Sequence, residues 1–131
     1  MAPGGVAGRA GLFGTGSDIA VFAQMLLNGG TYEGVRIVSD STVHLFTARA
    51  SGSRALGWEV ADGSHGAGNY LGEGAYGHTG FTGTSIWIDP ANDLFVVLLT
   101  NRVNPTRANT KISRWRQALA DAVVSAAASA R

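Results

Sequence analysis

Cysteine is absent from the 131-residue chain, and proline occurs only three times. Without cysteine the protein can form neither a disulfide framework nor a thiolate metal site, although this absence does not fix its compartment. Charged residues are scarce as well, at 15% of the sequence, and the formal net charge is only +1. This balance provides no basic surplus for nucleic acid and no polybasic run for an anionic membrane surface.

Long apolar runs are also missing. The longest apolar tract near the N-terminus, residues 19–27, is interrupted by Gln24 and is too short to span a bilayer. Residues 1–8 have neither the basic start nor the apolar run of a secretory signal peptide. We therefore expect no transmembrane segment and no signal peptide in this chain, and its localisation stays open.

Glycine is abundant, with 19 residues where average usage predicts about nine. Eight of the glycines fall between Gly63 and Gly83, so this stretch must turn often or approach other backbone closely. Apolar residues make up 45% of the sequence, which is typical of a globular protein. The length suits one compact unit, and no internal repeat or long linker divides it.

Two helices are expected in the N-terminal part of the chain. Thr15 or Ser17 can cap a helix over residues 17–27, and the glycines that follow can end it. A second, shorter helix is expected to start at Ser39 and to end near residues 47–50.

Strands are expected in the middle of the chain, over residues 56–60, 84–89 and 94–100. The last two are joined by a turn over residues 89–93, in which proline, asparagine and aspartate favour a bend. The strand over residues 94–100 is almost entirely apolar, which predicts cover on both of its faces.

A long C-terminal helix is expected over residues 107–127, with Asn104–Pro105 at its entry. Its predicted buried stripe consists of apolar side chains at helical spacing: Ile112, Trp115, Leu119, Ala122 and Val123. Two helices, several antiparallel strands and a long helix predict an α+β fold, with helices packed on an antiparallel sheet.

A recognisable motif, His78-Thr79-Gly80, opens the segment that leads into the apolar hairpin ending at Arg102. Upstream stand Gly8-Arg-Ala-Gly-Leu-Phe13 and the helix predicted over residues 17–27. Together these features resemble the C-terminal part of the beta-lactamase-related serine hydrolase family, which includes class C beta-lactamases, DD-peptidases and several esterases. The resemblance covers residues 4–107.

Members of this family carry three active-site elements: Ser-x-x-Lys with the nucleophile, Tyr-x-Asn or a similar triplet, and Lys-Thr-Gly or a variant on a strand. Only the third is present here, as the His-Thr-Gly variant. The single lysine, Lys111, follows Ala108 by three positions, and no tyrosine is followed two positions later by asparagine. The resemblance therefore implies that residues 1–131 are a single partial domain, an incomplete beta-lactamase/transpeptidase-like fold whose N-terminal half lies upstream of residue 1.

The resemblance also implies roles for four residues. The backbone N–H of Phe81 would be one of two oxyanion-hole donors, and Gly80 would let substrate backbone lie against the strand. Thr79 would offer its hydroxyl to a substrate carboxylate. His78 would take the place of the family's lysine. It would supply positive charge to the site less firmly than a lysine does, because histidine loses its charge near neutral pH.

Other interpretations of these residues remain open. Outside such a context, a residue like His78 is more often a strand-end histidine satisfied by a neighbour. The spacing of His44, His65 and His78 matches no zinc motif, so we expect neither a metal site nor a cofactor. Arg9 and Arg102 are candidate anion partners that the sequence alone does not place in a cleft.

The leading hypothesis is a portion of a serine hydrolase that, in the intact protein, hydrolyses a beta-lactam, a D-alanyl peptide or an ester through an acyl-serine. The chain alone would be inactive, and its partners would be that acyl substrate and the missing N-terminal half. Without that half, the strand over residues 94–100 would be an uncovered apolar edge prone to aggregation. A non-catalytic binding module and a truncated structural remnant are the alternatives. Intact relatives are often exported.

Overall fold

The computed structural model describes residues 11–64 and 66–130. The helices are α1 (Gly16–Leu27), α2 (Asp40–Thr47) and α3 (Ile112–Ser129). The strands are β1 (Thr31–Tyr32), β2 (Val35–Arg36), β3 (Glu59–Val60), β4 (Tyr76–Thr79), β5 (Ser85–Asp89) and β6 (Leu94–Leu98). None of these helices is long and apolar enough to cross a membrane, within the part of the chain that is described.

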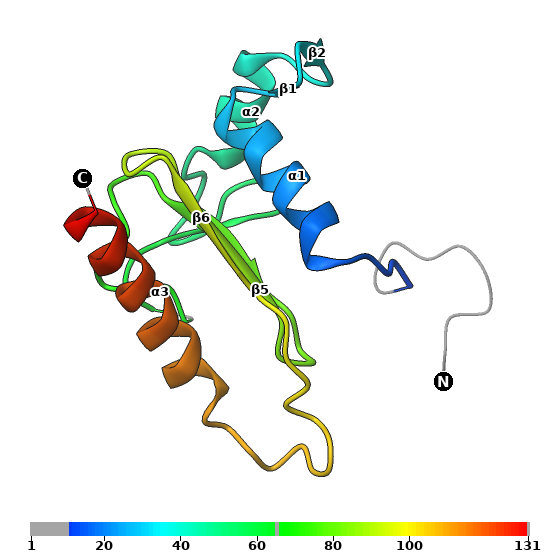
Figure 1. Cartoon of the computed structure of the whole chain (residues 1–131), viewed down its shortest axis with the longest axis vertical. Helices are drawn as coiled ribbons and strands as arrows, with labels where there is room; N and C mark the ends of the chain where they lie inside the picture. The colour runs from blue at the N-terminus through cyan, green and yellow to red at the C-terminus, as the bar shows by residue number, and fades with distance from the viewer. Residues whose placement is uncertain (1–10, 65, 131) are drawn as a thin grey trace.

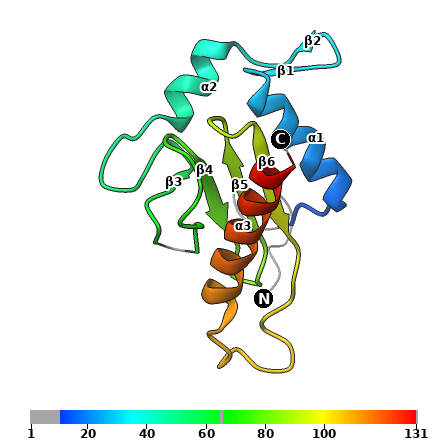
Figure 2. The same cartoon turned by 60° about the vertical axis from the view of Figure 1, so that its left-hand side comes forward.

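The main sheet has four antiparallel strands in the order β3-β4-β5-β6, and β1 pairs with β2 in a separate hairpin. Figure 1 shows the sheet on edge, with α1 on one side and α3 on the other. Figure 2 shows α3 lying in front of β5 and β6. The predicted α+β fold is confirmed, and β6 receives helices on both faces as its apolar sequence requires.

The N-terminal helices begin and end where the sequence predicts. Thr15 caps α1 in a capping box: its hydroxyl accepts from the Asp18 N–H at 3.2 Å, and its own N–H donates to the Asp18 carboxylate at 2.7 Å. The Thr15 N–H and hydroxyl bonds hold the pKa of Asp18 below its usual value. Ser39 caps α2 in the same way, accepting from the Thr42 N–H at 3.1 Å. Two glycines with positive φ follow α1.

The hydrophobic core lies between α1 and the sheet. Ala23 of α1, Tyr76 of β4 and Ile88 of β5 are at most 2% exposed and form its centre. Trp58 stacks on Phe22 at a ring separation of 6.2 Å and meets the Tyr76 ring edge-on at 5.3 Å. Side chains alternate between the two faces of a strand, so Asp89, which follows Ile88 in β5, buries its side chain on the opposite face of the sheet.

Three boundaries differ from prediction. The first expected strand shrinks to β3, and the strand expected over residues 94–100 ends at Leu98 as β6. Helix α3 begins at Ile112 rather than five residues earlier. Before it, the Thr106 hydroxyl accepts from a backbone N–H at 3.2 Å and the Asn109 amide oxygen accepts from another at 3.1 Å. Such local side-chain bonds compete with helical ones, so the helix starts late.

The buried face of α3 also differs from the predicted stripe. Its buried residues are Arg116, Ala120 and Val124, whereas Trp115 is 67% exposed. The glycine-rich segment causes this shift, because Gly66 packs on Arg116 and Gly68 packs on Ala120 with no room for a side chain. Hydrogen bonds also join the same segment to the helix: Asn69 Nδ2 and the Tyr70 N–H donate to Asp121, and Gln117 donates to Asn69.

Gly77, directly before the motif, is expected to tolerate no side chain. A Cβ there would overlap the Ile86 carbonyl and the Trp87 ring of the neighbouring strand. Gly77→Ala should therefore lower the free energy of unfolding by about 1–3 kcal/mol in urea melts of the full chain. Gly16→Ala is the matched control, because its Cβ would meet only Leu99 at 3.6 Å. That variant should be neutral or more stable, and equal effects of the two changes would contradict this packing.

Candidate functional site

The motif occupies the end of β4 and the turn that follows it. His78 and Thr79 are the last residues of β4, and Gly80 opens the turn. The Gly80 N–H donates to the Thr84 carbonyl at 2.7 Å, and the Gly83 N–H donates to the Gly80 carbonyl at 3.1 Å. These two bonds fix the turn between β4 and β5, so the motif sits on a defined backbone.

One edge of β4 is open beside the motif. Strand β3 pairs with β4 only at Tyr76 and Gly77, whereas β5 pairs with all four residues of β4. Within the described residues no strand covers the outer edge at His78 and Thr79. An extended peptide or acyl chain can add to a free strand edge of this kind through backbone hydrogen bonds.

Phe81 presents an unused donor next to this edge. Its backbone N–H donates to no acceptor among the described residues, and its side chain is 64% exposed. Its carbonyl, in contrast, accepts from Arg102 Nε at 2.7 Å. A free N–H held on a bonded turn can stabilise a developing negative charge on oxygen.

Residues that follow β6 brace the turn from one side. The Thr100 hydroxyl donates to the Gly83 carbonyl at 2.6 Å, and the Arg102 N–H donates to the Thr82 carbonyl at 2.8 Å. The Arg102 guanidinium also lies 4.5 Å from the centre of the Phe81 ring, in a cation–π contact. The structure therefore places Arg102, one of the two predicted anion partners, at the motif. Arg9 lies outside the described residues.

Arg116 stabilises the turn from the side of α3. One of its terminal nitrogens, Nη2, donates to the Gly80 carbonyl at 2.7 Å and to the Thr84 carbonyl at 2.8 Å. The residue is only 7% exposed, and burial, followed by the charge of Arg102, lowers the pKa of its guanidinium. Arg116 was not predicted as a site residue, because it lies outside the apolar stripe predicted to be the buried face of this helix.

A cavity of about 430 Å³ adjoins the turn. Its lining joins the motif to the start of α3: Thr79, Gly80, Phe81, Arg102, Thr110, Ile112, Ser113 and Arg116. Three of the four predicted site residues thus meet at one cavity. His78 does not line it; the histidine is exposed, and its Nδ1 lies 2.9 Å from the Thr79 carbonyl.

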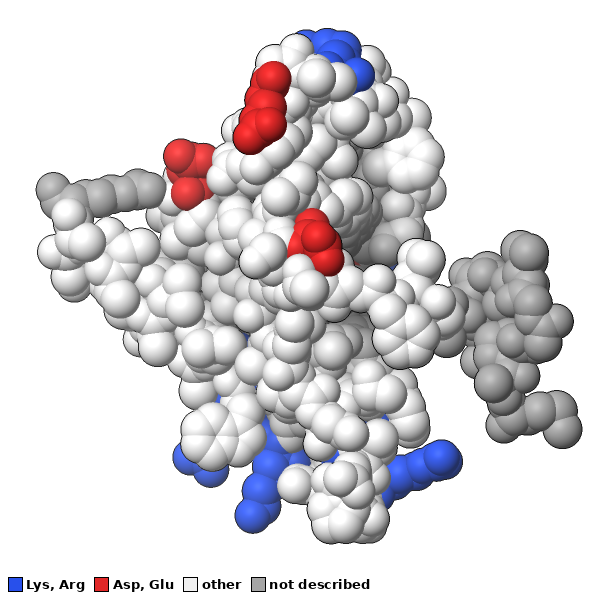
Figure 3. Space-filling view, turned by 45° about the vertical axis from the view of Figure 1, so that its right-hand side comes forward, with Lys and Arg blue, Asp and Glu red and all other residues white. Residues whose placement is uncertain are grey.

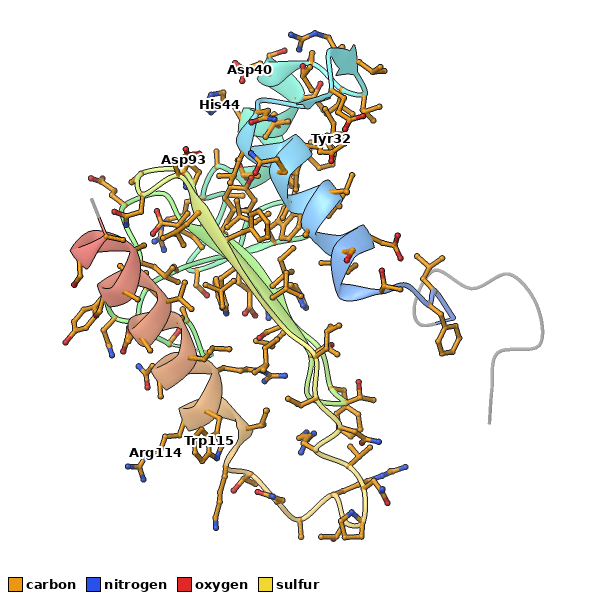
Figure 4. All side chains as sticks on the ribbon, viewed as in Figure 1. Tyr32, Asp40, His44, Asp93, Arg114 and Trp115 are labelled. Carbon is orange, nitrogen blue, oxygen red and sulfur yellow. The ribbon has the colours of Figure 1, made fainter. Side chains whose placement is uncertain are left out.

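A larger cavity, of about 580 Å³, lies at the far end of β4. Residues of α1 and α2 line it, among them Asp40 and His44, which lie side by side at 3.7 Å. Figure 4 shows both at the end of the molecule opposite Arg114. This cavity contains no residue of the motif, so the smaller cavity is the candidate site. No three metal-ligating side chains gather in residues 11–64 and 66–130, and His65 lies outside them.

Positive charge surrounds the candidate site. Five basic residues fall within residues 102–116, and the sequence has no Asp or Glu between Asp93 and Asp121. Figure 3 shows one face of the molecule, with most of the visible Lys and Arg side chains at its lower end, away from the acidic side chains. A cleft of one sign of charge attracts and orients a ligand of the opposite sign, here an anion.

Comparison with known proteins identifies the family. The model of the Beta-lactamase family matches residues 1–120, and the chain belongs to that family. A protein of Salmonella agona named "Putative D-alanyl-D-alanine carboxypeptidase" is 44% identical over 115 residues. Proteins of the same name from Salmonella paratyphi B and Salmonella newport are 43% identical. Each match covers 84% of this chain, and the chain spans 27% of the length of each relative.

Tyr76, two residues before the motif, has a buried hydroxyl. The residue is 2% exposed, and its oxygen has no hydrogen-bond partner among the described residues. Burial disfavours the phenolate and raises the pKa of Tyr76 to about 12 from its ordinary value of 10.0.

This raised pKa predicts a loss of stability at high pH. The neutral phenol is favoured in the fold, so its contribution is complete below pH 10 and is lost as the pH rises from 10 to about 12. Urea melts across this range should show the decline, and Tyr76→Phe should remove part of it. Tyr70→Phe is the matched control, because the Tyr70 side chain is 61% exposed. An unchanged decline in Tyr76→Phe would contradict the prediction.

Proposed function

We propose that this chain forms the strand-side wall of an acyl-serine hydrolase site, completed by a serine from a part of the protein outside residues 1–131. The unpaired Phe81 N–H, next to the open edge of β4, carries this proposal. In the complete site, the serine would attack the carbonyl of a beta-lactam, a D-alanyl peptide or an ester. Water would then release the acyl group and regenerate the serine.

The proposed role of Phe81 follows from the charge that acyl transfer creates. Attack by the serine oxygen places negative charge on the substrate carbonyl oxygen, and fixed N–H donors stabilise that charge. Gly80, which precedes the donor, has no side chain, and a Cβ there would overlap the Thr84 hydroxyl. The second donor would come from the backbone of the serine itself, as the family resemblance implies.

The surroundings favour an anionic substrate. Arg102 lines the cavity with Thr79, and neither has an acidic partner among the described residues. A substrate carboxylate, such as that of a D-alanyl peptide, could accept from the Thr79 hydroxyl beside this positive charge. His78 lies on the open edge of β4, where it could meet the missing tyrosine or the substrate itself.

The chain carries no Ser-x-x-Lys, so we propose that it is inactive alone. Its 27% share of the relatives' length supports this proposal, because most of each relative lies outside the matched region. A non-catalytic binding module is the second candidate. The cavity, the open strand edge and the positive charge favour it, since all three are present without a nucleophile.

We also propose that the uncovered side of β6 binds the missing half of the domain. Strand β6 pairs only with β5 among the described strands, which leaves its other edge open. Beside it lies a hollow of about 370 Å³. Its apolar lining residues are Leu98, Ile112, Trp115 and Leu119, and polar residues from the segment between β6 and α3 complete the lining. Figure 4 shows Trp115 at the outer surface of α3. An apolar surface next to a free strand edge suits a partner strand and helix of the same domain.

The catalytic proposal predicts complementation. The purified chain should not hydrolyse nitrocefin or a p-nitrophenyl ester. The chain co-expressed with the part of the Salmonella agona relative that lies outside the matched region should hydrolyse nitrocefin or the ester. A complex in which the Ser-x-x-Lys serine expected in that part is replaced by alanine is the control. Turnover by the chain alone that disappears on changing one of its own serines would contradict the proposal. Binding of a D-alanyl peptide without any turnover would favour the binding module.

The docking proposal predicts a specific effect of Trp115. Trp115→Gln should raise the soluble yield of the chain alone and weaken its complex with the complementing half about tenfold or more, a loss of ~1.4 kcal/mol. Leu45→Gln on α2 is the matched control, since Leu45 is similarly exposed, at 63% against 67% for Trp115. Equal behaviour of the two variants in co-purification would argue against this docking surface.

A further inference from the structure

The peptide unit between Gly80 and Phe81 is held on its carbonyl side. The Gly80 carbonyl accepts from Arg116 Nη2 at 2.7 Å and from the Gly83 N–H at 3.1 Å. Gly80 and Phe81 share this unit, because the carbonyl of the first residue and the N–H of the second lie in the same plane. The contact made by Arg116 therefore acts directly on the orientation of the Phe81 donor.

Peptide geometry fixes where that donor points. The cis peptide bond of the described residues is Asn104–Pro105, so the Gly80–Phe81 unit is trans. In a trans unit the C=O and N–H bonds point in opposite directions. Since the carbonyl points at Arg116 of α3, the Phe81 N–H points away from α3. Figure 1 shows α1 on the side of the sheet opposite α3.

Two features set Arg116 apart from an arginine that only stabilises the fold. Its ion-pair partners would be carboxylates, but the ion pairs of residues 11–64 and 66–130 involve only Arg54 with Glu59 and His44 with Asp40. Its Nε is buried without a partner, so one of its donors is left unsatisfied. Burying a guanidinium that meets only carbonyls is unfavourable for stability, and well-packed apolar groups would serve a purely structural site better.

Two carbonyls at the ends of one turn are what Arg116 does bind. Gly80 begins the turn and Thr84 ends it, and Nη2 lies 2.7 Å and 2.8 Å from their respective oxygens. A single planar guanidinium thus ties both ends of the turn to α3. Its charge also polarises the peptide unit, because a hydrogen bond from a cation to a carbonyl strengthens the donor at the other end of the same unit.

We infer that Arg116 is a positioning residue for the oxyanion donor: by holding the Gly80 carbonyl, it aims the Phe81 N–H at the acyl oxygen. This inference rests on the function proposed above. Arg116 lines the cavity on the α3 side, but its Nη2 bonds go to two backbone carbonyls, so it would act on the acyl oxygen through the backbone. Its removal should therefore lower the rate of acyl transfer and leave substrate binding almost unchanged.

The first test uses the full chain without substrate. Arg116→Met keeps an apolar stem but removes the donors. In ¹⁵N relaxation measurements, the order parameter of the Phe81 N–H should fall from a rigid value of about 0.85 to below about 0.6. The Ile88 N–H in β5 reports whether the sheet remains folded and should not change. A Phe81 N–H that stays rigid in a folded Arg116→Met chain would overturn the inference.

The second test uses the complex with the complementing half. Arg116→Met should lower kcat about 10- to 100-fold, less than the loss of the donor itself, while KM changes less than threefold. Arg116→Lys keeps the charge but not the planar fork, so its kcat should fall between those of the unsubstituted complex and of Arg116→Met. This second variant keeps the test valid should Arg116→Met not fold. A change in KM alone, or an unchanged kcat in Arg116→Lys and Arg116→Met, would overturn the inference.

Arg114→Met is the matched control. Arg114 lies two residues earlier on α3, and Figure 4 shows it pointing away from the sheet. Its removal should leave kcat within twofold, which excludes a general effect of positive charge. Absence of turnover in the unsubstituted complex would refute the proposed function. Normal turnover in the unsubstituted complex with no effect of Arg116 would refute the positioning role alone.

Discussion

The candidate site depends on one constraint, the pair of hydrogen bonds that Arg116 donates to the carbonyls of Gly80 and Thr84. They join the C-terminal helix to the turn that follows the motif, across 36 and 32 residues of sequence. Because the peptide unit is planar, fixing its carbonyl leaves the Phe81 N–H free and directed away from α3. A turn without this brace would offer the same donor in many directions, and a donor must be preorganised to stabilise a transition state.

The rest of the molecule has the form of one side of a larger site. An open strand edge, a cavity and a concentration of positive charge converge on the motif, and the sequence carries no Ser-x-x-Lys to face them. The chain belongs to the Beta-lactamase family and spans 27% of the length of the curated relatives it matches. The apolar surface around Trp115 and the free edge of β6 are explained by the same proposal, since a completing half would cover both.

Local signals in the sequence predicted much of this structure. The caps at Thr15 and Ser39 and the hairpin between β5 and β6 depend on neighbouring residues, so their positions could be derived. The buried face of α3 could not, because glycines some fifty residues away select it by packing on Arg116 and Ala120. The motif itself was found from its triplet and its setting. The brace behind it was missed because an arginine in an amphipathic helix ordinarily faces water.

The most direct test is a crystal structure of the chain in complex with its complementing half, trapped as an acyl-enzyme with a slowly hydrolysed ester or beta-lactam. We predict that the acyl carbonyl oxygen lies about 2.7–3.1 Å from the Phe81 nitrogen, with the Gly80 carbonyl still bound to Arg116. An acyl oxygen outside hydrogen-bonding reach of that nitrogen, or a Phe81 N–H bonded within the chain, would contradict the account.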